Sequence, residues 1–107
     1  MLNTKKHIRV DMDFSSNPVW FSEDGKEFIH GEVNDLDITD DLAIWLEFYR
    51  KMWENEVGRS EFNKNFKSDV TGIVYALQIS LATRLKDELP DSVIYVWDNE
   101  TSSNKVV

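Results

Sequence analysis

The feature that most constrains the fold is the order of the apolar patterns, with a strand pattern at each end and two helical patterns between them. Residues 7–14 alternate strictly between polar and apolar side chains, which is typical of a strand with one buried face. Residues 92–97 are β-branched and aromatic with little alternation, which favours a strand in the interior of a sheet. With 107 residues, the chain is long enough for one domain with its own core.

Turn signals predict two further strands after the first one. The sequence SSNP at 15–18 ends the first strand, because Ser and Asn form local turns and proline cannot donate a ladder hydrogen bond. The residues VWF at 19–21 predict a short strand, EDG at 23–25 predicts a turn, and residues 26–33 are its predicted hairpin partner. Three strands therefore precede the first predicted helix.

The first predicted helix starts at a capping signal. Thr39 is a suitable N-cap, and Asp40 and Asp41 fall in the first turn, where the helix dipole favours negative charge. Large apolar residues then recur with helical spacing, widened by Ile44 and Phe48; they are Leu42, Trp45, Leu46, Tyr49 and Trp53. We expect this aromatic stripe to pack against the core, although it also matches a ligand site or an exposed groove for a partner helix.

The second predicted helix covers residues 68–89. Its middle is apolar on most sides, so we expect it to be the central helix. If the last strand pairs in parallel beside the first, both helices form the crossover and lie on one face of the sheet. The order β-β-β-α-α-β predicts an α+β two-layer sandwich in a single domain over residues 1–107. Residues 98–107 are polar, and we expect them to form a flexible, frayed tail.

Negative charge is concentrated in one third of the chain. Residues 11–41 hold ten carboxylates and only Lys26 as a full positive charge, so their net charge is −9, against −8 for the whole chain. Repulsion within such a segment costs stability, and binding of a basic partner is one reason to keep it. The alternative is that these carboxylates bind no partner: they are simply solvated, increase solubility or stabilise the start of a helix. Because phosphate backbones and anionic lipids repel acidic surfaces, we expect neither nucleic acid nor membrane as a partner.

Composition narrows the classes of protein to which the chain can belong. The chain has no cysteine, which excludes disulfides, cysteine metal sites and thiol catalysis. Basic residues near the start are not followed by the apolar run of a signal peptide, and no segment approaches the ~20 apolar residues of a membrane span. We therefore expect a cytoplasmic protein without a cofactor. The sequence leaves the oligomeric state undetermined.

A small metal-dependent hydrolase is the enzymatic alternative. Asp11 and Asp13 lie on one predicted strand face, where two carboxylates can hold Mg²⁺ or act as acid and base. A solvated strand face, with Arg9 neutralising Asp11, is the simpler interpretation. His7 and His30 lack the spacing of a zinc site, and the chain has no phosphate-binding glycine loop or nucleophile elbow. We therefore predict no enzymatic activity.

Three sequence motifs resemble a known group of proteins. They are DFSSNPVW at 13–20, DLDITDDL at 35–42 and LATRLKDELPDSVIYV at 81–96. Together they resemble small acidic bacterial immunity proteins of contact-dependent growth inhibition and related polymorphic toxin systems, over roughly residues 7–98. An aromatic residue after the strand aspartate and a nearby Pro-x-Trp are shared features, matched here by Asp13, Phe14, Pro18 and Trp20. The resemblance carries no catalytic residues.

The resemblance implies inhibition of a cognate toxin domain by binding it in the cytosol. Many such toxins are nucleases with a basic groove, which an acidic surface can cover. The predicted partner contacts are the following: Trp20 as an aromatic anchor, or else a packing residue, and Glu23, Asp24, Glu32, Asp35, Asp37, Asp40 and Asp41 as electrostatic contacts. A regulatory adaptor with a partner other than a toxin is the alternative protein-binding function.

Overall fold

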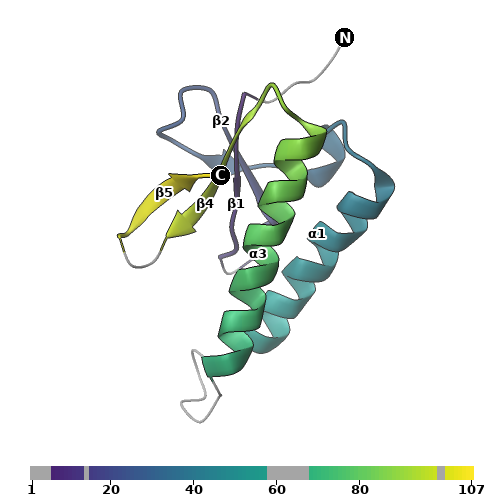
Figure 1. Cartoon of the computed structure of the whole chain (residues 1–107), viewed down its shortest axis with the longest axis vertical. Helices are drawn as coiled ribbons and strands as arrows, with labels where there is room; N and C mark the ends of the chain where they lie inside the picture. The colour runs from purple at the N-terminus through teal and green to yellow at the C-terminus, as the bar shows by residue number, and fades with distance from the viewer. Residues whose placement is uncertain (1–5, 14, 58–67, 99–100) are drawn as a thin grey trace.

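The computed structural model describes residues 6–13, 15–57, 68–98 and 101–107, and it contains a five-stranded mixed sheet with two helices packed on it (Figure 1). The strands are β1 (His7–Val10), β2 (Val19–Ser22), β3 (Ile29–His30), β4 (Val93–Asp98) and β5 (Ser103–Val106). The helices are α1 (Asp40–Met52) and α3 (Ser68–Glu88), with a 3-10 turn η1 (Val33–Asp35) before α1 and a π-helical turn η2 (Trp53–Val57) after it. The predicted α+β class is confirmed.

Strand β1 lies at the centre of the sheet, whose order is β3-β2-β1-β4-β5. It pairs in parallel with β4, where Ile8 lies opposite Ile94, and antiparallel with β2, where Arg9 lies opposite Trp20. A parallel pair needs a crossover connection, and α1 and α3 belong to it. The prediction that the strand after the helices is interior is thus confirmed, and its parallel pairing with β1 meets the condition under which the helices form the crossover.

The C-terminal tail was predicted wrongly for residues 103–106. They form β5, which pairs antiparallel with β4 and places Asn104 opposite Trp97. The side chains of this strand are mostly polar and exposed, so the sequence shows no apolar alternation that would predict a strand. Backbone hydrogen bonds to β4 hold the segment instead, because every strand residue carries a donor and an acceptor.

The first strand is shorter than the alternating pattern of residues 7–14 predicts. Its ladder ends at Val10, and residues 11–13 lead into the turn before β2. The Ser16 hydroxyl accepts a hydrogen bond from the Asp13 amide at 2.9 Å, which fixes this turn. The expected inward position of Phe14 lies outside the described residues.

The core lies between the helical layer and one face of the sheet. Ile8 and Val10 of β1 and Ile94 and Val96 of β4 point into it, and they meet buried side chains of both helices, namely Leu42, Leu46, Tyr49, Val74, Leu81 and Leu85. No helix among the described residues has the length and apolarity of a membrane span.

The helices bury less of their apolar surface than predicted. On α1, Ile44, Trp45 and Phe48 are 67%, 42% and 49% exposed, so the expected packing of the whole aromatic stripe is wrong. On α3, Ile73 and Ile79 are also exposed, and this helix is not enclosed on most sides. Two helices on one sheet face leave each helix with a free outer side, which explains both differences.

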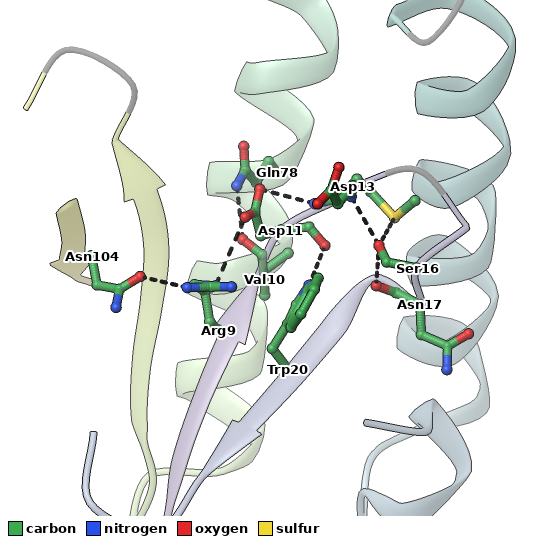
Figure 2. Close-up of polar contacts among 10 residues, drawn as sticks. Arg9, Val10, Asp11, Asp13, Ser16, Asn17, Trp20, Gln78 and Asn104 are labelled. Carbon is green, nitrogen blue, oxygen red and sulfur yellow. Dashed lines mark hydrogen bonds and ion pairs between the residues drawn. The ribbon is translucent and has the colours of Figure 1, made fainter. Parts of the chain in front are cut away.

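A buried amide joins α3 to the central strand. The Gln78 side chain is only 5% exposed and donates a hydrogen bond from Nε2 to the Val10 carbonyl oxygen at 2.7 Å (Figure 2). Val10 is the last residue of β1, so Gln78 supplies a donor where the strand ladder stops. This contact fixes the rotation of α3 relative to the sheet.

Replacing Gln78 by leucine is expected to destabilise the fold by about 1–3 kcal/mol, because the buried carbonyl loses its side-chain donor. Ser80→Ala, on the exposed side of the same helix, is the control and should change stability by less than about 0.5 kcal/mol. Urea unfolding of both variants measures the difference. Equal stability of the two variants would contradict a structural role for the Gln78 contact.

Candidate protein-binding surface

The acidic side chains that follow β2 all lie at the surface. Residues 23–41, here called the acidic segment, hold eight carboxylates and Lys26, a net charge of −7, and all eight carboxylates are exposed. The segment leads from the loop after β2 through edge strand β3 and η1 to the start of α1. In Figure 1 it stays in the half of the molecule that contains the sheet, while the far ends of α1 and α3 project beyond that half.

Internal cations neutralise little of this charge. Asp41 forms an ion pair with Arg84 of α3, with 2.9 Å between Oδ2 and Nη2. The other predicted electrostatic contacts form no ion pair within the part of the chain that the structure describes; they are Glu23, Asp24, Glu32, Asp35, Asp37 and Asp40. The acidic segment therefore presents mostly uncompensated negative charge to the solvent.

Asp24 has a structural role within the loop after β2. Its Oδ1 accepts hydrogen bonds from the Lys26 amide at 2.8 Å, the Glu27 amide at 3.2 Å and the Ser22 hydroxyl at 3.0 Å. These bonds favour the carboxylate and lower the pKa of Asp24 to about 2. Gly25 then adopts a φ of 76°, in the left-handed region that favours glycine. Asp24 is thus less available to a partner than its exposure implies.

The start of α1 is joined to the end of α3. The Thr39 hydroxyl accepts a hydrogen bond from the Leu42 amide at 3.3 Å, which confirms the predicted N-cap. The Glu88 carboxylate of α3 in turn accepts hydrogen bonds from the Thr39 amide and hydroxyl at 2.7 and 2.9 Å. With the pair between Asp41 and Arg84, these bonds fix the positions of Asp40 and Asp41 beside the end of α3.

The predicted acidic contacts form three groups instead of one cluster. Glu23 and Asp24 follow the end of β2. Glu32 lies near the beginning of that strand, where its Oε1 accepts a hydrogen bond from Asn17 Nδ2 at 3.3 Å. The third group precedes and opens α1, and it consists of Asp35, Asp37, Asp40 and Asp41. The negative charge is therefore spread over separate parts of the surface.

Trp20 packs on the sheet face opposite the helices. Its indole N–H donates a hydrogen bond to the Asp11 carbonyl oxygen at 3.1 Å (Figure 2). Its ring meets the His30 ring edge-on, with 4.3 Å between the centroids. Trp20 is half-buried. Its polar group and one ring edge are thus engaged within the chain, which favours the packing interpretation over the interface anchor.

Arg9 is the centre of an aromatic cluster on this same face. Its guanidinium carbon lies 4.9 Å from the Trp20 ring, 5.0 Å from the Phe28 ring and 5.8 Å from the Trp97 ring. Nη1 donates to Asn104 Oδ1 at 3.1 Å, while the buried Nε lacks a hydrogen-bond partner. Cation–π contacts of this kind stabilise a charge that is partly removed from water. The cluster covers part of the sheet face on which no helix packs.

Residues that suggested a metal site have other partners here. His7 Nδ1 lies 2.8 Å from the Tyr95 hydroxyl, and His30 packs against Trp20. Among the described residues, no group of three or more histidine or carboxylate side chains is placed to hold a metal ion. The hydrolase alternative, based on Asp11 and Asp13, therefore gains no supporting geometry from these residues.

Burial raises the pKa of Asp11 to about 6, although the Arg9 charge and the Met12 amide lower it. The Asp11 side chain is 22% exposed, and its Oδ2 lies 3.8 Å from Arg9 Nε. A carboxyl group with a raised pKa binds its proton more tightly in the folded chain than in the unfolded chain. Its contribution to stability is therefore greatest below about pH 4 and is lost as the pH rises to about 6.

Asp11→Asn is expected to remove this pH dependence. At pH 7.5 the variant should be more stable than the parent protein by up to about 3 kcal/mol, because no buried charge must form. At pH 4 the two proteins should be nearly equal. Urea unfolding at both pH values measures the difference in stability between the variant and the parent protein. A difference that is the same at both pH values would contradict the raised pKa of Asp11.

Comparison of the chain with protein families, curated proteins and solved structures finds no match. The exposed surface of the described residues is therefore the structural basis for a proposed function. The surface has a second feature, the exposed apolar side chains of α1, which was not predicted from the sequence. Helical spacing alone does not tell how much of the helix circumference is buried. The excess of aromatic residues on that helix was the available signal.

Proposed function

We propose that this protein binds a cationic protein through the acidic segment and neutralises it, in the manner of an immunity protein that blocks a toxin domain. The resemblance of three motifs to immunity proteins suggests this class. The single observation that carries the proposal is that eight exposed carboxylates lie within residues 23–41, with one ion pair to a described cation.

The arrangement favours a protein partner over a small ligand. Carboxylates spread over a surface produce an extended negative potential, which attracts a large basic surface from a distance. Such steering raises association rates and depends strongly on salt. A nuclease domain has a basic groove for phosphates, so an acidic protein placed there excludes the nucleic acid and matches the charge.

The acidic side chains differ in how freely they can contact a partner. Asp24 closes its own loop, Asp41 is paired with Arg84, and Glu32 is bonded to Asn17. Glu23, Asp35 and Asp37 are exposed, and their carboxylates form no ion pair with the described residues. These three are the best candidates for direct electrostatic contacts.

Reversing these three charges is expected to slow association with the partner. The partner is obtained by capture from the producing cell. The variant E23K/D35K/D37K should bind at least about tenfold more slowly at low salt, because steering is lost. Stopped-flow or surface-binding kinetics at low and high salt measure the effect, which should shrink at high salt.

The matched control is E54K/D87K/D91K, which changes the net charge equally at exposed positions outside the acidic segment. It should retain most of the association rate of the parent protein. If both triple variants slow association to the same degree, only the overall charge matters and the acidic segment is not the interface. Unchanged rates in E23K/D35K/D37K would also reject the proposal.

A further inference from the structure

The outer side of α1 carries a line of exposed residues with a charge at each end. Leu42, Leu46 and Tyr49 mark the side that faces the core. Half a helical turn away are four exposed residues at positions i, i+4, i+8 and i+11, here called the outer stripe: Asp40, Ile44, Phe48 and Lys51. The stripe is negative at the start of the helix, apolar in the middle and positive at the end.

The middle of the stripe is too apolar for an ordinary solvated helix face. Ile44 is 67% exposed and Phe48 is 49% exposed, and Trp45 beside them is 42% exposed. The Trp45 and Phe48 rings meet edge-on with 5.5 Å between centroids, so they form one aromatic patch. α3 flanks α1, and in Figure 1 no other described element lies beside α1 on the side away from α3. Contiguous exposed apolar side chains are a feature of interaction surfaces.

The order of residues in the outer stripe makes it complementary to itself. Two copies of α1 can pack antiparallel about a two-fold axis near residue 46. The numbers of two residues that face each other across this axis then add up to 91 or 92. Asp40 then faces Lys51 of the second copy, and Ile44 faces Phe48. Because the axis repeats every contact, the pairing gives two Asp–Lys pairs around an apolar centre.

We propose that the outer stripe is a homodimer interface, in which α1 of one copy packs antiparallel on α1 of a second copy. The opposite charges at its two ends argue for this occupant over a uniformly basic protein, because such a protein would meet Lys51 at one end. In a parallel arrangement, by contrast, like charges would meet at both ends, and this would oppose binding. The pairing also leaves Glu23, Asp35 and Asp37 outside the stripe, so it does not depend on the proposed function.

The dimer is a weak one. A single helix of 13 residues is about 20 Å long, and it offers less area than a standard stable interface. The net charge of −8 on each copy also opposes association. We therefore expect a dissociation constant on the order of 100 μM, which is within the range of analytical ultracentrifugation.

A charge exchange tests the register of the two helices. The parent protein should sediment with an average mass that rises from 12.5 kDa toward twice that value between about 5 and 500 μM. D40K and K51D should each weaken dimerisation at least about tenfold, because each places like charges opposite one another. The double variant D40K/K51D restores opposite charges and should recover the dimer to within about threefold of the parent protein.

Matched controls and a second kind of variant complete the test. D91K and K105D make the same changes of charge at exposed positions elsewhere and should leave dimerisation near the parent value. F48S should abolish it, and circular dichroism should show native helix content because Phe48 is half exposed. A parent protein that stays monomeric at 500 μM, or a double variant no better than the single ones, would overturn the proposal. These experiments contain no partner, so they fail or succeed independently of partner binding.

Discussion

The parallel pairing of β1 with β4 is the constraint on which the rest of the structure depends. A tight turn cannot join two parallel strands, so the chain between them must cross over, and the crossover contains both helices. The hairpin of β2 and β3 occupies the other side of β1 and ends at the edge of the sheet. Residues 31–39 connect that edge to α1. Connecting segments run over the surface of a protein, which agrees with the exposure of the carboxylates among these residues.

Surface position alone does not explain the amount of charge. The fold uses Asp24 to close a loop and Asp41 to pair with Arg84, and helix-start placement favours Asp40. Charged residues beside an edge strand also discourage pairing of strands between molecules, which gives the positions next to β3 a structural reason. Glu23, Asp35 and Asp37 have no such role among the described contacts. Uncompensated surface charge of one sign costs stability, and binding of a cationic protein would offset that cost.

Much of the fold was predictable because periodic burial dictates it. The alternation around Ile8 and Val10, the Thr39 cap and the β-branched run at Ile94 and Val96 each reflect a local rule, and all three were placed correctly. β5 was not predictable, since backbone bonds to β4 hold its polar residues. The exposure of the outer stripe of α1 was not predictable for a different reason. The sheet and one neighbouring helix cover only part of the circumference of α1, and the spacing of apolar residues does not tell how large that part is. The cluster around Arg9 required the register of β1, β2 and β5.

The central claim is that the acidic segment carries charge that the fold itself leaves uncompensated. Its most direct test is the salt dependence of stability, measured by urea unfolding from about 20 to 500 mM NaCl, a range over which screening shortens the reach of exposed charges several-fold. The parent protein should become more stable as salt rises, because screening weakens the repulsion. E23Q/D35N/D37N should be more stable at low salt and should respond less to added salt. Loss of stability in the parent protein on adding salt would contradict the account, because it would mean that internal pairs already neutralise these carboxylates.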